Sequence, residues 1–295
     1  MAKTKTSPSR KLFLVVNYIV LTIISLLCVL PFINLLAISF SEKTAVAANE
    51  VSFWPVGFNV AAYKFILDND QFLRALWISI QRTVLGVLIN IVLIIFTAYP
   101  LSKSKQDFRL RNVFSWYFVV TILFSGGLIP TYMVVKYTGL MDTIWALVLP
   151  GAVPIFNVVL MMNFFRSIPK EIEEAAFIDG AGHPTTLLKI YLPLSLPSLA
   201  TVSLFVIVNH WNSWFDGIIY MNHTYNYPLQ SYLRTIIINP DLQSMTSSEE
   251  LVMSEISERT FKAAQIFLGA LPILCVYPFL QKYFMSGLTM GSVKG

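Results

Sequence analysis

The sequence predicts an all-α, polytopic membrane protein with six transmembrane helices. Of its 295 residues, 56% are hydrophobic and only 13% are charged, and its mean hydropathy is +0.65. Soluble domains use roughly 25% charged residues, so this composition indicates a chain that lies in a bilayer. The apolar runs are continuous, whereas the strands of a membrane barrel would alternate over about ten residues. Helices are therefore the expected spanning elements.

A helix needs roughly 20 residues to cross about 30 Å of hydrocarbon. Uncharged runs of about that length or longer occur at residues 12–41, 83–102, 112–135, 143–165, 190–215 and 263–281. The first run is about twice as long as the apolar part of a signal peptide, so we expect it to be retained. Gly126, Gly127 and Pro130 predict a break in the third run. Arg82, at the margin of the second run, is expected to extend outward to the membrane surface.

Basic residues remain preferentially in the cytoplasm, so their distribution predicts the orientation. They gather before the first run, between the second and third, and between the fourth and fifth: Lys3, Lys5, Arg10, Lys11, Lys103, Lys105, Arg109, Arg111, Arg166, Lys170 and Lys189. Both termini are thus expected inside the cell. The predicted organisation is a cytoplasmic segment 1–11, a membrane domain 12–285 and a cytoplasmic tail 286–295. The net charge of +5 follows from this bias and implies no nucleic-acid partner.

The chain has no motif for enzyme chemistry. It has no Gly-rich P-loop with Lys and Ser or Thr to hold nucleotide phosphates, and no HExxH, CxxC or Gly-x-Ser-x-Gly motif. Cys28 and Cys275 lie in apolar runs, which indicates neither a disulfide framework nor a metal site. We expect a protein that is not an enzyme and that binds no cofactor itself.

A polar island at residues 166–190 separates the fourth and fifth runs. Pro169 suits the first turn of a helix, and the acidic residues after it lie near the positive end of the helix dipole. Gly180 can end this helix in a left-handed conformation, and Pro184 can open another. The pattern predicts helix, tight turn, helix. An amphipathic helix lying in the membrane interface is the alternative.

This island resembles the signature loop of ABC importer permeases at Glu174-Ala175-Ala176, Asp179-Gly180-Ala181, Ile190 and Leu192-Pro193. The resemblance implies a type I ABC importer permease architecture, in which the loop is a cytoplasmic coupling helix that docks on an ATP-hydrolysing subunit. The residues that it assigns to ATPase coupling are Glu173, Glu174, Ala175, Ala176, Asp179, Gly180 and Ala181. ATP and Mg would then be bound by the partner ATPase.

Two further regions are similar to carbohydrate-uptake permeases. One is the C-terminal sequence SGLTMGSVKG at 286–295, and the other is the Trp-Asn pair near the outer end of the fifth run. Amides can bond sugar hydroxyls and a Trp face can cover a sugar ring. The candidate substrate-path residues are Asn209, Trp211, Asn212 and Trp214. An aromatic belt at the membrane interface is the alternative reading of the tryptophans.

The resemblance implies a bacterial cytoplasmic-membrane permease for oligosaccharides, coupled to ATP through alternating access. It implies a second, non-identical permease, two ATP-binding subunits and an extracytoplasmic solute-binding protein, with membrane lipid around the chain. The outer segments 42–82 and 216–262, the second with acidic Glu249, Glu250, Glu255 and Glu258, could be solvated loops or a docking surface for the binding protein. Residues 227–234 and 258–262 are similar to permeases for acidic oligosaccharides such as alginate or pectin fragments. A permease for a non-sugar solute and an ion-driven transporter remain alternatives.

Overall fold

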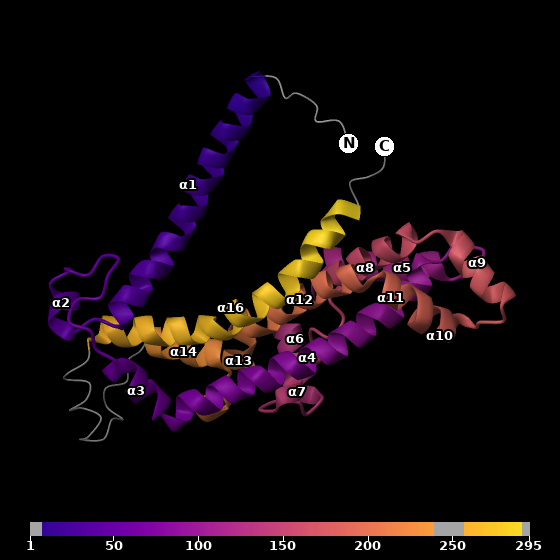
Figure 1. Cartoon of the computed structure of the whole chain (residues 1–295). Coiled ribbons are helices and arrows are strands. Elements are labelled where there is room, and N and C mark those ends of the chain that lie inside the picture. The colour runs from indigo at the N-terminus through magenta and orange to yellow at the C-terminus, as the bar shows by residue number, and fades with distance from the viewer. Residues whose placement is uncertain (1–7, 239–256, 291–295) are drawn as a thin grey trace. The chain divides into compact units, whose positions relative to one another are not determined.

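The computed structural model describes residues 8–238 and 257–290, and all regular structure within them is helical (Figure 1). This confirms the all-α prediction. The described chain divides into two compact units. One takes residues 8–69 and 257–269, and the other takes residues 70–238 and 270–290.

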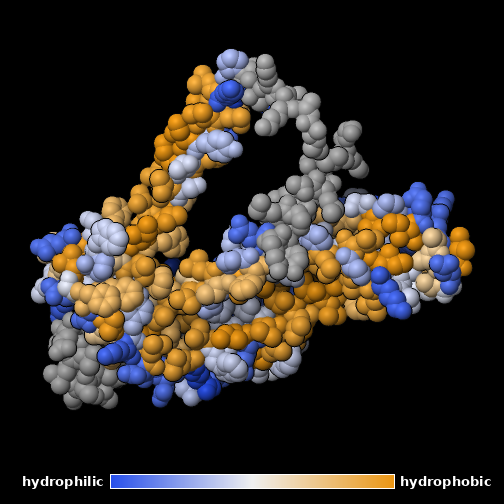
Figure 2. All heavy atoms as spheres, viewed as in Figure 1, coloured by the Kyte–Doolittle hydropathy of each residue, from blue (hydrophilic) through white to orange (hydrophobic). Residues whose placement is uncertain are grey.

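The first unit contains one long apolar helix, α1 (Pro8–Ser39). Its shorter helices are α2 (Lys43–Ala47) and α3 (Ala61–Leu67), and the first turns of α16 (Glu258–Met290) belong to it. Most of α1 is exposed, and Figure 2 shows a largely apolar surface along it, as expected for a helix that meets lipid or another apolar subunit. Its end is fixed by Ser39 Oγ, 2.7 Å from the hydroxyl of Tyr63, and by Phe40, which stacks on Phe58.

The second unit is built around α4 (Asp70–Ser102), which packs against α8 (Ile155–Ser167) and α12 (Leu196–Asn212). Its core is apolar and fully buried, with Ile94, Ala98, Val158, Met161, Phe165, Val202 and Val206 at its centre. The other early helices are α5 (Arg111–Leu123), α6 (Leu128–Tyr137) and α7 (Ile144–Val148). Later come α9 (Lys170–Ile178), α10 (His183–Thr186), the π-helix η1 (Leu187–Tyr191), α11 (Leu192–Leu194), α13 (Phe215–Tyr220), the 3₁₀ turn η2 (Thr224–Asn226) and α14 (Leu229–Ile238).

The membrane-spanning pattern is less regular than six continuous helices. Three described helices are long and apolar enough to cross a bilayer, namely α1, α4 and the Glu258–Phe279 part of α16. Two helix pairs reach that length only together: α5 with α6, bent by 114°, and His183–Leu194 with α12, bent by 83°. The α5–α6 break falls at residues 124–127, as Gly126 and Gly127 predicted. The fourth run is divided into α7 and the short apolar helix α8. That the chain has six transmembrane helices therefore stays a prediction.

Two segments outside the predicted spans contain helix. The segment 216–262 contains α13, η2 and α14, while Glu249, Glu250 and Glu255 lie outside the described residues. Helix α16 continues to Met290, past the expected start of the tail at residue 286, and residues 291–295 lie outside the described part.

Candidate functional site

The polar island folds as predicted, into helix α9, a tight turn and helix α10. Gly180 has a φ of +83°. This is the left-handed conformation that glycine adopts without steric cost. The N–H of Ala181 donates to the carbonyl of Ala176 at 2.9 Å, and the N–H of Gly180 donates to that of Phe177 at 3.0 Å. This pair of bonds defines a Schellman motif, which satisfies carbonyls at the end of α9, so the turn is held by backbone atoms.

Helix α9 presents two different faces. Ala176 is buried, whereas Glu174, Ala175 and Asp179 are exposed. The carboxylate of Glu173 turns inward and lies 2.6 Å from the Lys103 ammonium. The exposed surface of α9 is therefore free of packing within this unit, and it is mixed in character, because Ile178 is 86% exposed beside Glu174 and Asp179. Hydrophilic residues gather around this helix in Figure 2.

A polar cavity of about 370 Å³ lies in the same unit, between α4, the α7–α8 segment, α12 and α13. Apolar residues and prolines form part of its wall. Its polar lining consists of Arg82, Asn90, Asn157, Asn209, His210, Ser213, Asp216 and Tyr220. A cavity with several amides and few charges is suited to a ligand with many hydroxyl groups.

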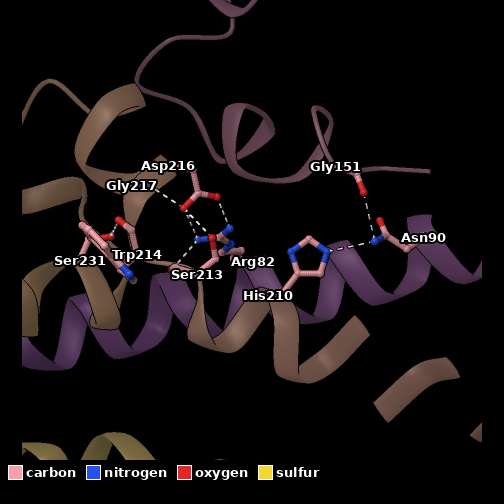
Figure 3. Close-up of polar contacts among 9 residues, drawn as sticks. All are labelled: Arg82, Asn90, Gly151, His210, Ser213, Trp214, Asp216, Gly217 and Ser231. Atoms are coloured by element: carbon pink, nitrogen blue, oxygen red, sulfur yellow. Dashed lines mark hydrogen bonds and ion pairs between the residues drawn. The ribbon is translucent and has the colours of Figure 1, made fainter. Parts of the chain in front are cut away.

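An ion pair between Arg82 and Asp216 lies in the wall of this cavity (Figure 3). Arg82 is 2% exposed. One guanidinium nitrogen donates to the carbonyl of Ser213 at 3.0 Å and to the Asp216 carboxylate at 3.1 Å, and the other pairs with the second carboxylate oxygen. Asp216 also accepts from the Ser213 hydroxyl at 2.9 Å and from the N–H of Gly217 at 2.9 Å. The expectation that Arg82 extends outward is wrong, because Asp216 satisfies its charge inside the unit.

Helices α4 and α12 approach closely beside this ion pair. A Cβ at Gly86 would lie only 2.4 Å from Nε2 of His210, so glycine is needed for the ring to lie there. The same nitrogen is 3.3 Å from the side-chain amide of Asn90 (Figure 3). Within the described residues, Arg82 Nε and His210 Nδ1 are buried without a hydrogen-bond partner. A buried polar atom without a hydrogen-bond partner costs free energy.

Comparisons with known proteins place the chain in a family. No protein-family model matches it. It is 41% identical over 285 residues to the Polygalacturonan/rhamnogalacturonan transport system permease protein YtcP of Bacillus subtilis (strain 168), covering 97% of this chain and 99% of that protein. It is 40% identical to Protein LplC of the same organism, with 97% and 96% covered. The chain belongs to the carbohydrate-uptake permeases of ABC importers.

A solved structure agrees with this assignment. The permease matches a chain from a bacterial ABC transporter involved in the import of the acidic polysaccharide alginate, with a TM-score of 0.86 and 33% sequence identity, covering 96% of this chain and 100% of that one. The permease is therefore a multi-pass membrane protein with the helical fold of ABC importer permeases. This family membership excludes the ion-driven transporter as its class.

Of the four predicted substrate-path residues of the permease, one lines the cavity. Asn209 is in its wall. Trp211 is buried at 5% exposure and Asn212 is exposed, and neither belongs to the lining. Trp214 lies with its ring 4.9 Å from the Arg234 guanidinium, outside the lining too. Their roles in transport stay predictions.

The remaining polar residues of the cavity were missed by sequence reasoning. Arg82 and Asp216 are 134 positions apart, so no local spacing pairs them. Asn90 and Asn157 looked like isolated amides in apolar runs. The available signal was that each is a polar residue in a segment expected to lie in hydrocarbon, where such residues usually face the interior of the bundle.

Proposed function

We propose that this chain is one of two non-identical permease subunits of an importer for acidic oligosaccharides in the bacterial cytoplasmic membrane. The proposal rests on the exposed face of α9 and the glycine turn that follows it. Both occur in a chain that resembles a carbohydrate-uptake permease over 97% of its length. One ATP-binding subunit would dock on this face and a second on the partner permease, and an external binding protein would deliver the solute. ATP binding would shift the membrane bundle between inward-open and outward-open states.

The substrate class is supported by the relatives. YtcP is named for polygalacturonan and rhamnogalacturonan, and the solved transporter is described as importing alginate, so these relatives handle polymers that contain uronic acids. The test is uptake by vesicles that contain the permease pair, the ATPase and the binding protein. Oligogalacturonate should accumulate with ATP, and maltodextrin should not. Uptake of maltodextrin alone would overturn the acidic-sugar proposal, and no ATP-dependent uptake of either would overturn import of these sugars.

The cavity is the part of this chain that is best placed to contact the sugar. If it does, Asn209→Ala should lower the uptake rate by roughly tenfold, since a lost hydrogen bond that leaves a buried partner unpaired costs about 1–3 kcal/mol. Asn212→Ala is the comparison variant: the sequence also predicts Asn212 on the substrate path, but it is an exposed amide on the same helix outside the lining, so its uptake should stay normal if the cavity is the path. Normal uptake by both variants would place the sugar contacts on the partner permease.

The orientation follows from the basic segments and can be tested directly. In a background without Cys28 and Cys275, a cysteine at Asp179 in the exposed α9 turn should react with an impermeant thiol reagent only after the membrane is permeabilised. A cysteine at Thr224, exposed in η2, should react in intact cells. The reverse pattern would place the α9 turn outside and exclude docking on a cytoplasmic ATPase.

A further inference from the structure

Glu173 and Glu174 are adjacent on α9 but have different surroundings. Successive residues of an α-helix point about 100° apart, so neighbours can face opposite ways. The Glu174 side chain is exposed, whereas that of Glu173 is only 14% exposed. One carboxylate is therefore available to another subunit, and the other is used within this chain.

Glu173 takes part in a buried cluster that joins three segments. One carboxylate oxygen lies 2.6 Å from Nζ of Lys103, and the other accepts from the Tyr191 hydroxyl at 2.7 Å. Nζ of Lys103 also lies 4.0 Å from the ring centre of Tyr99 and 4.1 Å from that of Tyr191. Lys103 directly follows α4, Glu173 is on α9 and Tyr191 ends η1. We call these four residues the Lys103 clamp.

Burying the ion pair of the Lys103 clamp costs desolvation free energy. The Lys103 side chain is 7% exposed, and burial lowers the pKa of its ammonium, while the bond to Glu173 opposes that change. Buried ion pairs often contribute no more stability than apolar residues of similar size, whereas their geometry is specific. We therefore infer that the Lys103–Glu173 ion pair fixes the position of α9 against the helix bundle rather than adding stability.

The clamp connects α9 to two of the helices that line the cavity, α4 and α12. Helix α4 is continuous from Asp70 to Ser102, so the same rigid element carries Arg82, Gly86 and Asn90 and leads directly to Lys103. Tyr191 belongs to the π-helix that leads through α11 into α12, which carries Asn209 and His210. Single π-helical turns are frequent at functional sites. A displacement of α9 would thus reach one wall of the cavity through α4 and a second wall through the bent segment that runs from η1 through α11 into α12.

We propose that Lys103 is a positioning residue for transport: through Glu173 it ties the coupling helix to α4 and η1, so that movement of α9 is delivered to the cavity. This inference rests on the proposed function. In this proposal two adjacent residues of α9 have different roles: Glu174 is available to the ATPase, and Glu173 binds Lys103 and Tyr191 within this chain.

The test uses the whole importer in vesicles, with uptake and ATP hydrolysis measured on the same preparation. Lys103→Met and Glu173→Gln should each assemble with the ATPase and hydrolyse ATP, while uptake per ATP hydrolysed falls about tenfold, within the range of coupling free energies. The double variant should be no worse than either single variant, because both remove the same interaction. Lys105→Met is the matched control, since Lys105 is an exposed lysine two residues away, and its uptake per ATP should be normal.

The outcomes are distinguishable. Normal uptake per ATP in assembled Lys103→Met or Glu173→Gln would overturn the inference while leaving the importer proposal intact. Loss of assembly in both variants would also overturn it, because the clamp would then be a folding element. Absence of uptake by the unmodified importer would instead overturn the proposed function on which the inference rests.

Discussion

Replacing Gly180 with valine should abolish uptake while leaving the permease inserted in the membrane. The φ of Gly180 is +83°, and no neighbouring atom lies within 4 Å of a new Cβ. The strain therefore comes from the backbone alone, and it costs a residue other than glycine roughly 1–2 kcal/mol. Relieving it would break the Schellman bonds to Ala176 and Phe177, so we expect α9 to be misplaced against the ATPase. The measurements are uptake in vesicles and ATP hydrolysis stimulated by the binding protein.

Two variants control for this result. Gly180→Asn should keep most activity, because asparagine tolerates the left-handed region. Gly182→Ala should be close to normal, since Gly182 has a φ of −84° and its new Cβ would only reach ordinary contact, at 3.8 Å from Pro184. Normal uptake by Gly180→Val at normal expression would refute the importance of this turn.

Removing the Arg82 side chain should cause the largest loss of stability. Arg82→Met leaves the Asp216 carboxylate with only the Ser213 hydroxyl and the Gly217 N–H as partners. Breaking a buried ion pair in this way costs about 3–5 kcal/mol. We expect a clearly lower midpoint of thermal unfolding in detergent and poor recovery of the complex.

The matched control for Arg82 is Arg74→Met, on the same helix. Arg74 is exposed and its guanidinium lies 3.7 Å from the ring centre of Tyr225. A cation–π contact is worth roughly 0.5–1 kcal/mol at an exposed site. Arg74 also donates hydrogen bonds to Tyr225 and Asn226, but its loss leaves no buried carboxylate without its cation. In the double variant Arg82→Met, Asp216→Asn, part of the lost stability should return, because no buried carboxylate is left without its cation. Equal unfolding midpoints for Arg82→Met and Arg74→Met would show that the buried pair has no special weight.

The features that the sequence could predict are those written in local patterns. The helix start at Pro169 and the turn at Gly180 follow from the backbone preferences of single residues, and the structure confirms both. The break near Gly126 was likewise predictable. All three depend on residues within one or two helical turns of one another.

The features that the sequence could not predict depend on packing over long separations. Arg82 sits at the margin of an apolar run, where extension to the surface is the usual outcome. Only the folded chain places Asp216 beside it. Lys103 and Glu173 are 70 positions apart, so Glu173 looked like one more acidic residue of the coupling loop. The division of the fourth run into α7 and α8 is not visible in hydropathy, although Pro150 and Pro154 stand in the segment between the two helices.

The Schellman turn at the end of α9 should allow the exposed residues of this helix to be exchanged between importers. Because backbone atoms close the turn and Glu173 with Ala176 face inward, the exposed side chains of α9 have little to do with how the loop folds. Grafting the outward residues of another permease onto Glu174, Ala175 and Asp179 should then redirect the choice of ATPase without refolding the chain. The surface of α9 would then determine which ATPase binds, while the membrane helices stay the same.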